Sequence, residues 1–325
     1  MKRRELIALI GGGAIVPLAL PSVARAQQRP NKIARIGIID NSPLWEAYRE
    51  GLRSAGYVEG RNISFVYRAA EGQPERLATA AADLARLPVD VIATYGTPAS
   101  RAARTATPSI PIVAIAVGDP VAAGLVQTLA HPGGNVTGNT ILSPDLGPKR
   151  LQLLREVIPS AARVALLWNP DNLSNRMIFE QLRDAAAAQN FEFEAVEAHS
   201  ASDLEDAFTT MMRKRPDAVF VTSDPILQSH MQKVIELLFR YGLPGMFQTR
   251  DNVAAGGLMA YGPSFPDMFS QGAFFTDKIL HGVKPADLPV QTPQRFLLVF
   301  NLKTARAIGL KISDKVLLRA DEVIE

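Results

Sequence analysis

After residue 30 the sequence contains two similar passages, and this internal repeat constrains the fold more than any other feature. The first passage covers residues 87–125 and the second covers residues 215–258. Each has a proline closely followed by an aspartate, an apolar strand, a polar tip, a helix and a second strand. Each then ends in Val-Ala-Ala-Gly, at residues 121–124 and 253–256. Three matches in the same order predict two similar βαβ units, and therefore two similar lobes with a cleft between them.

Short β-branched apolar runs alternate with segments of helical spacing along the chain. The predicted strands cover residues 33–39, 63–67, 89–94, 111–117, 136–141, 162–168, 191–196, 217–222, 244–248 and 296–301. The predicted helices cover residues 46–55, 74–87, 98–106, 173–189, 202–213, 225–241 and 266–280. This alternation predicts parallel sheets with right-handed crossovers, in which ligands bind beyond the carboxyl ends of the strands. The expected fold class is α/β, with two doubly wound parallel-sheet lobes joined by a three-stranded hinge.

The domain boundaries follow from where the chain would cross between the lobes. Crossings are expected near residues 138–144, near residues 258–262 and in the proline-rich stretch 285–293. The predicted domains are a signal peptide (1–26), lobe one (33–139 plus 259–285) and lobe two (140–258 plus 286–325).

The N-terminus has the pattern of an export signal. Met1 to Glu5 is basic, residues 6–20 are apolar, and Ala24-Arg25-Ala26 matches a small-residue cleavage site, so cutting is expected before Gln27. Arg3-Arg4 suits the twin-arginine route, although Sec export also tolerates paired arginines. The apolar run contains prolines and glycines and is short for a membrane span. We therefore expect a mature protein in the periplasm, exported by either route, with no stable membrane insertion after the signal is removed.

The charge balance argues against a nucleic-acid partner, and the cysteine content excludes covalent links through cysteine. The formal net charge of +3 arises in the first 26 residues, because without them the 35 basic and 32 acidic residues become 31 of each. A nucleic-acid partner loses its electrostatic support. The chain has no cysteine, which excludes disulfides and a lipid anchor on cysteine.

Polar residues at the predicted strand tips are the candidate ligand contacts. Thr97 and Pro98 begin a helix, where backbone N–H groups and the dipole favour an anion; alternatively Thr97 is only an N-cap. Asp224, before Pro225, could likewise bind a ligand ammonium or only cap a helix. Asp119 precedes a proline, which turn chemistry alone would explain.

Three aromatic residues lie at or near the same tips: Tyr95, Trp168 and Tyr261. Each could form an apolar wall of a small-molecule site, or could simply pack in the core. The two passages differ at these tips, since residues 94–97 offer helix-end donors whereas residues 222–224 offer a carboxylate. This asymmetry suits a zwitterionic ligand.

Catalytic and metal-binding patterns are weak. None of the four histidines has metal-ligand spacing to another, and there is neither a G-x-S-x-G elbow nor a phosphate-binding P-loop. We expect no enzyme activity, no catalytic residues, no metal and no cofactor. The alternative function is an exported α/β hydrolase or isomerase that uses Asp119 and Asp224 as acid and base across the cleft. A transcription repressor is excluded because the signal peptide occupies the place of its DNA-binding helices.

Several motifs carry a resemblance to a known family. They are Gly60-Arg61-Asn62-Ile63, Val89-Asp90-Val91-Ile92, Gly118-Asp119-Pro120-Val121, His131 to Gly138, Gly256 to Pro263 and Arg319 to Glu325. Together they resemble the ABC-transporter substrate-binding family that includes tryptophan- and tyrosine-binding members, over essentially all of the mature chain. The loop from Asp40 to Trp45 departs from that pattern, with Trp45 where smaller residues are common.

The resemblance implies a type I periplasmic binding protein with a three-stranded hinge, which would capture a small solute by cleft closure. An amino acid is the expected solute, aromatic or branched, and an inner-membrane ABC permease is the expected partner. By the same resemblance, the residues expected to contact the ligand include Thr97 to Ala99, Gly118-Asp119, Asn169 and Ser223-Asp224. With the strand tips, the candidate ligand-binding residues are Asn41, Ser42, Tyr95, Thr97, Pro98, Ala99, Gly118, Asp119, Trp168, Asn169, Ser223, Asp224 and Tyr261.

Overall fold

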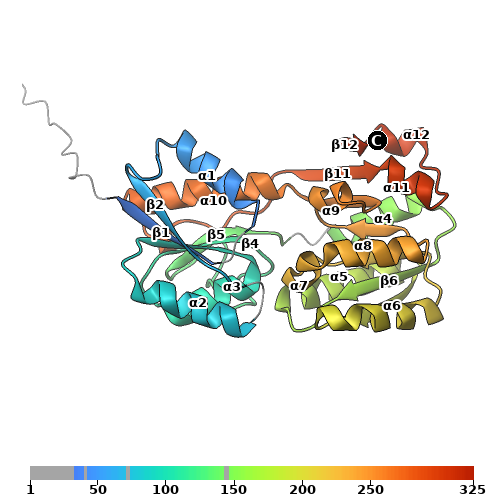
Figure 1. Ribbon diagram of the computed structural model, residues 1–325, viewed down its shortest axis with the longest axis horizontal. Coiled ribbons are helices and arrows are strands. Elements are labelled where there is room, and N and C mark those ends of the chain that lie inside the picture. Colours follow the sequence, from blue (N-terminus) through green and yellow to red (C-terminus); the bar gives the residue numbers. More distant parts are fainter. Residues whose placement is uncertain (1–32, 40–41, 71–73, 143–145) are drawn as a thin grey trace, which may run out of the picture. The chain divides into compact units, whose positions relative to one another are not determined.

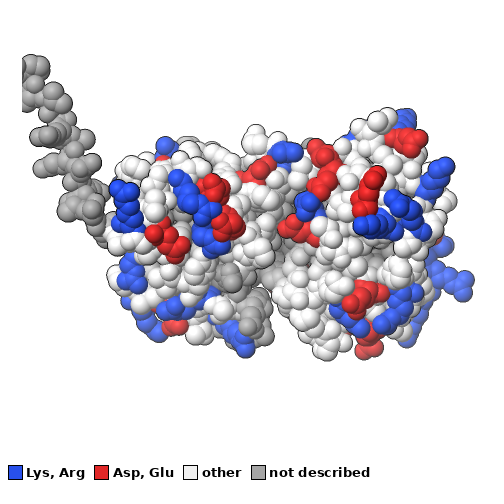
Figure 2. Space-filling model, turned by 45° about the horizontal axis from the view of Figure 1, so that its top comes forward, with Lys and Arg blue, Asp and Glu red and all other residues white. Residues whose placement is uncertain are grey.

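The computed structural model describes residues 33–39, 42–70, 74–142 and 146–325. The predicted signal peptide and the candidate Asn41 lie outside these residues. None of the helices among them is long and apolar enough to cross a membrane. Basic and acidic side chains are interspersed on the face shown in Figure 2, as expected of a mature chain with balanced charge.

The first lobe is a five-stranded sheet with helices on both faces (Figure 1). All of its strand pairs are parallel, in the order β2-β1-β3-β4-β5. The strands are β1 (Ala34–Ile39), β2 (Ile63–Arg68), β3 (Val91–Tyr95), β4 (Ile112–Val117) and β5 (Val136–Thr140). The helices are α1 (Trp45–Ser54), α2 (Pro74–Arg86), α3 (Gly96–Ala106) and α10 (Phe265–Leu280).

Alternate residues of each strand enter different cores, because successive side chains of a strand point to opposite faces. In β3, Val91 and Ala93 pack with α1 and α10, whereas Ile92 packs with α2 and α3. Trp45 is fully buried among Tyr48 and Phe269, with edge-to-face ring contacts, so this departure from the family pattern serves the core.

The second lobe is a seven-stranded sheet in the order β12-β11-β10-β9-β8-β6-β7, in which β10 and β11 form the antiparallel pair. The strands are β6 (Arg163–Trp168), β7 (Glu192–Glu197), β8 (Ala218–Val221), β9 (Gly245–Phe247), β10 (Met259–Pro263), β11 (Phe296–Asn301) and β12 (Glu322–Ile324). The helices are α4 (Leu146–Val157), α5 (Leu173–Ala188), α6 (Leu204–Arg213), α7 (Pro225–Ser229), α8 (Met231–Arg240), α9 (Arg250–Ala254), α11 (Leu302–Ala307) and α12 (Asp314–Leu317). Two 3₁₀ turns are η1 (Ala201–Asp203) in this lobe and η2 (Pro285–Asp287), which packs on β5.

The internal repeat appears directly in the strand order. The first sheet runs β2-β1-β3-β4-β5, and the matching part of the second runs β7-β6-β8-β9-β10. The predicted α/β class with two doubly wound lobes is therefore confirmed. In this strand order the crevice for a ligand lies between the first and third strands, at their carboxyl ends.

The repeated aspartates have the same structural role in both lobes. The Asp90 carboxylate accepts a bond from the backbone N–H of Arg35 at the start of β1, at 2.9 Å. The Asp217 carboxylate accepts bonds from the N–H groups of Ala162 and Arg163 at the start of β6, at 2.9 and 2.8 Å. Both satisfy backbone donors at the amino ends of the strands, far from any ligand crevice at the opposite ends.

Strand pairing moves the predicted lobe boundaries by a few residues. Residues 259–263 were expected in lobe one, but they form β10, which pairs with β9 and β11 of the second sheet. Thr140, expected in lobe two, pairs with Val117 of β4. Residues 286–291, also expected in lobe two, lie on the first lobe, where the Gln291 N–H bonds to the carbonyl of Gly138. In each case backbone hydrogen bonding decides the boundary.

Two predicted elements have a different form in the structure. The single helix expected at 225–241 is α7 and α8, interrupted at His230, whose Nδ1 lies 3.0 Å from the Ile226 carbonyl. The second Val-Ala-Ala-Gly segment, expected as a turn, begins inside the short helix α9, which ends at Ala254, two residues before Gly256. Glycine suits both segment ends, since Gly124 and Gly256 have φ of 69° and 119°.

Candidate functional site

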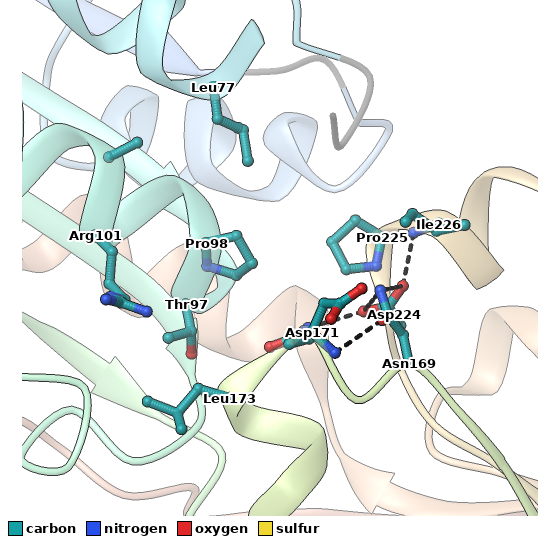
Figure 3. A pocket seen from close by; sticks show the side chains of 12 residues that line it. Leu77, Thr97, Pro98, Arg101, Asn169, Asp171, Leu173, Asp224, Pro225 and Ile226 are labelled. Carbon is teal, nitrogen blue, oxygen red and sulfur yellow. Dashed lines mark hydrogen bonds between the residues drawn. The ribbon is translucent and has the colours of Figure 1, made fainter. Parts of the chain in front are cut away.

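A cavity of about 230 Å³ lies where carboxyl ends of strands from the two sheets face each other. The first lobe contributes residues from α2 and α3: Leu77, Thr97, Pro98, Arg101 and Ala102. The second lobe contributes the segments that follow β6 and β8: Asn169, Asp171, Asn172, Leu173, Asp224, Pro225 and Ile226. Figure 3 shows Pro98 and Pro225 on opposite sides of this cavity. The strand-end prediction is thus matched by a cavity at the expected edge of both sheets.

A smaller chamber of about 30 Å³ shares Thr97, Pro98, Asn172 and Pro225 with the larger cavity. Its other lining residues are Tyr95, Gly96, Ala116, Ile141, Ser174, Ser223 and Phe265. Burial raises the pKa of Tyr95 to about 12, and a side-chain hydrogen bond with Ser223 opposes that rise. The phenol therefore stays protonated at neutral pH.

Asp224 is the only acidic side chain among the described residues that both lines the larger cavity and is almost fully buried, with 1% of its surface exposed. Its carboxylate caps α7 by accepting a bond from the N–H of Ile226 at 2.9 Å. No Lys, Arg or His of the described residues forms an ion pair with it. A buried carboxylate without a cation is costly unless polar groups hold it, which makes its surroundings informative.

Three asparagine amides surround that carboxylate. Asn172 and Asn175 donate to Oδ2 of Asp224 at 2.9 and 3.2 Å, and Asn169 lies 3.5 Å from both oxygens (Figure 3 shows the Asn169 contacts). Asn172 is held in turn because its Oδ1 caps α5, accepting from the N–H of Ser174 at 3.1 Å. The sequence positions these groups by ending β6 in a polar loop and starting α5 directly after it.

The first-lobe wall is the start of α3. Thr97 lies inside the helix and Tyr95 is the N-cap residue, so the N-cap interpretation of Thr97 is wrong. The reason is that the helix begins directly after β3, through Gly96 with φ of 77°. No side chain caps this helix start. The Thr97 hydroxyl instead contacts Ser174 of α5 at 2.5 Å and accepts from the N–H of Gly118 at 3.1 Å.

Arg101 lines the cavity one helical turn beyond Thr97. Among the described residues it has neither an ion-pair nor a hydrogen-bond partner. Besides the polar residues of the lining, the wall has an apolar part, with Leu77 and Ala102 from the first lobe and Leu173 and Ile226 from the second. The cavity therefore has an anionic group on one lobe, a cationic group on the other and apolar surface between them.

Of the predicted contacts, the two cavities bring together Tyr95, Thr97, Pro98, Asn169, Ser223 and Asp224. The remaining described candidates line neither cavity: Ser42, Ala99, Gly118, Asp119, Trp168 and Tyr261. Ser42 accepts from the N–H of Leu44, and Ala99 is buried in the first-lobe core.

Trp168, at the end of β6, and Tyr261, in the middle of β10, pack against neighbouring rings. Trp168 stacks on Phe179 of α5 at a centroid distance of 4.9 Å, and Tyr261 stacks on Phe296 of β11 at 6.0 Å. Their strand faces direct the rings toward neighbouring elements, so of the three expected aromatic walls only Tyr95 lines a cavity.

Asp119 acts in its own turn. Its Oδ1 accepts from the N–H groups of Val121 and Ala122 at 2.9 and 3.0 Å. It does not join Asp224 in either cavity. The pair of carboxylates that the alternative, an exported hydrolase or isomerase, requires is therefore not assembled in this structure.

Sequence reasoning missed several lining residues. Asp171 and Asn172 could have been included, because they continue the polar run that begins at Asn169 after a predicted strand. Arg101 shares the helical face of Thr97 at a spacing of four residues, which was also a usable signal. Leu77 lies in a helix remote from every predicted tip, and no local pattern indicates it.

Two doubly wound lobes with a cavity between the carboxyl ends of their strands have the fold of type I periplasmic binding proteins, which is shared with solved structures of low sequence identity. The chain belongs to the family of ABC transporter substrate binding proteins, which matches residues 33–324. The resemblance expected from the motifs is confirmed.

Relatives of assigned ligand are similar to this chain. A tyrosine-binding protein of Clostridioides difficile (strain R20291) is 27% identical over 267 residues, which cover 82% of this chain and 76% of that protein. An ABC domain from Streptococcus pneumonia in complex with L-Trp is 25% identical with a TM-score of 0.85, covering 90% of this chain and 100% of that one. The ligand-free, open structure of a substrate-binding protein from Clostridium difficile is 26% identical with a TM-score of 0.65, covering 90% and 99%.

Proposed function

We propose that this protein is the solute receptor of an ABC importer and that it binds an aromatic amino acid between its two lobes. Exported after removal of residues 1–26, it would work in the periplasm and deliver its ligand to an inner-membrane permease. The proposal includes closure of the lobes on the ligand and no chemical turnover, in keeping with a family of solute-binding proteins.

The observation that carries this proposal is the uncompensated Asp224 carboxylate in the cavity wall. Neutral amides stabilise it, but a ligand ammonium would add the missing positive charge through a short, charge-assisted hydrogen bond. An ammonium bound in such a buried site gains more than it would at the surface, because water no longer screens the pair.

The opposite wall supplies the complement for a ligand carboxylate. The start of α3 has no side-chain cap, and its dipole favours negative charge. Arg101, on the same helix and without a partner among the described residues, supplies a full positive charge. We assign the α-carboxylate to this wall and the α-ammonium to Asp224.

The ligand side chain would occupy the apolar part of the cavity, between Leu77 and Ala102 of one lobe and Leu173 and Ile226 of the other. Such apolar walls around a few convergent polar groups are typical of small-molecule sites. The tyrosine- and tryptophan-binding relatives support an aromatic side chain.

The test is titration calorimetry of the mature protein against the twenty amino acids, with L-tyrosine and L-tryptophan as the leading candidates. Each aromatic ligand is paired with two analogues, one lacking the amino group and one lacking the carboxylate. Binding of an aromatic L-amino acid, with strong loss for both analogues, is the expected result. Equal affinity for the deaminated analogue would contradict the assignment of Asp224, and no binding across the amino acids and a wider solute library would refute the proposal.

A further inference from the structure

A direct contact between protein atoms of the two lobes lies beside the cavity. Ser174, in the first turn of α5, packs against Gly118, which follows β4 of the first lobe. A Cβ placed on Gly118 would lie 2.4 Å from Oγ, 2.6 Å from Cβ and 3.1 Å from Cα of Ser174. The three nearest neighbours of that Cβ all belong to the other lobe.

Close approach of the opposite lobe therefore explains why position 118 is a glycine. Its φ lies outside the left-handed region, so its own backbone would accept alanine. The three atoms nearest to a Cβ at this position all belong to Ser174 of the second lobe. The absent side chain is what allows Ser174 to approach.

Hydrogen bonds complete the contact. The hydroxyls of Thr97 and Ser174 form a buried hydrogen bond at 2.5 Å, and Thr97 also accepts from the N–H of Gly118. Asn172 fixes the position of Ser174 through its cap and also bonds to Asp224. The contact is thus coupled through one asparagine to the carboxylate that we assign to the ligand ammonium.

The chain as a whole superposes better on a liganded relative than on an open one. At almost equal sequence identity, the chain superposes on the L-Trp complex with a TM-score of 0.85 and on the open, ligand-free relative with 0.65. In this arrangement Ser174 of one lobe contacts Thr97 and Gly118 of the other directly.

We propose that Ser174 is a positioning residue that holds the lobes closed in the unliganded protein and thereby sets the ligand affinity. This rests on the closure included in the proposed function. The apparent dissociation constant is the intrinsic value divided by the closed fraction, so a contact that raises this fraction strengthens binding without touching the ligand. One net hydrogen bond changes the ratio of closed to open forms about fivefold.

The test is single-molecule FRET between dyes on the two lobes, measured without ligand. Because the chain has no cysteine, Thr105→Cys in α3 and Thr209→Cys in α6, both exposed, provide unique labelling sites. Gly118→Ala is expected to move the unliganded distribution to lower transfer efficiency and to weaken ligand binding at least fivefold. Ser174→Ala removes only the hydrogen bond and should produce a smaller shift in the same direction.

Two further variants separate closure from folding. Gly134→Ala is the matched control, because a Cβ at Gly134 meets nothing within 4 Å, and it should behave as the wild type. Ser174→Gly in the Gly118→Ala background removes the two closest colliding atoms, Oγ and Cβ, and should recover the closed population to about the level of Ser174→Ala, because the hydrogen bond to Thr97 stays absent. Restoration by a second change in the other lobe is not expected if Gly118→Ala merely damages the first lobe.

The proposal is overturned if neither Gly118→Ala nor Ser174→Ala shifts the unliganded distribution relative to Gly134→Ala. The readout does not depend on knowing the ligand. A shift of the unliganded distribution without any amino-acid binding would support the role of the contact and refute the proposed function. Amino-acid binding without such a shift would support the proposed function and refute the role of the contact.

Discussion

Asp224→Asn offers the sharpest separation between a structural and a ligand-binding role for that residue. Asparagine is as good an N-cap as aspartate, so the bond to the Ile226 N–H can persist. Only the negative charge and one acceptor oxygen are lost. Asn172 and Asn175 would then face an amide instead of Oδ2, which costs about 1 kcal/mol of unfolding free energy.

The effect on ligand binding should be larger. Removing one partner of a buried ion pair costs about 3–5 kcal/mol, and residual solvation of the ammonium in an open cavity reduces this to about 2–4 kcal/mol. The dissociation constant of an aromatic amino acid should therefore rise by about 30- to 700-fold. Calorimetry measures the affinity, and urea unfolding measures the stability of the same preparation.

Asp171→Asn is the matched control. Asp171 lines the same cavity, but its side chain is 68% exposed and pairs with His199 at 2.8 Å. Exposed pairs contribute at most about 1 kcal/mol, so this variant should change the dissociation constant less than about fivefold. If both variants had equally small effects on affinity, Asp224 would be a helix cap and no more.

A double-mutant cycle with the deaminated analogue makes the assignment specific. The wild type should lose about as much affinity for the analogue as Asp224→Asn loses for the amino acid. Asp224→Asn should then hardly distinguish the two compounds, because the group that recognises the ammonium is gone. Full discrimination by the variant would place the ammonium elsewhere.

Three other predictions concern the scaffold and pH. Asp217→Ala should lower the unfolding free energy by about 1–3 kcal/mol, because two strand-start N–H groups lose their acceptor, while the ligand affinity stays within twofold. Gly138→Ala should lower the unfolding free energy, measured in urea, by about 3 kcal/mol, because φ at Gly138 is 139° and the added Cβ would lie 1.9 Å from the Ala114 carbonyl oxygen. Gly134→Ala is the neutral comparison. The hydrogen bond to Asp171 raises the pKa of His199, so this histidine stabilises the fold at low pH and the effect is lost as pH rises through the raised pKa. His199→Gln should therefore lower Tm more at pH 5.5 than at pH 8.5, and an equal loss at both values would contradict it.

The sequence was sufficient for the topology because the determinants of topology are local and repeated. Apolar β-branched runs, helical spacing and turn glycines recur in the same order, and strand alternation with helices leaves few possible arrangements. The strand β10 was harder, because residues 259–263 carry no local signal for which of the two sheets they join. Pairing with β9 decides this, through contacts remote in sequence.

The site was predictable to the extent that it consists of strand tips. Asn169 and Asp224 directly follow β6 and β8, so topology alone brings them to one edge of the sheet. Trp168 and Tyr261 show the limit of this reasoning. Proximity to a tip does not say which sheet face a ring occupies, and both rings point into packing with Phe179 and Phe296.

The choice between cap and ligand contact, which the sequence left open for Asp224, is not exclusive. An ionised carboxylate has about four acceptor positions. Three bonds of 2.9–3.2 Å fill part of this capacity, one to the helix start and two to asparagine amides, and Asn169 reaches the two oxygens only at 3.5 Å. The equivalent helix in the first lobe begins without any side-chain cap. The repeat thus places two helix starts at matching points of two sheets. Only the helix start in the second lobe carries a carboxylate, and this difference makes the two sides of the cavity unlike in charge. The unused acceptor capacity of Asp224 is available to an ammonium.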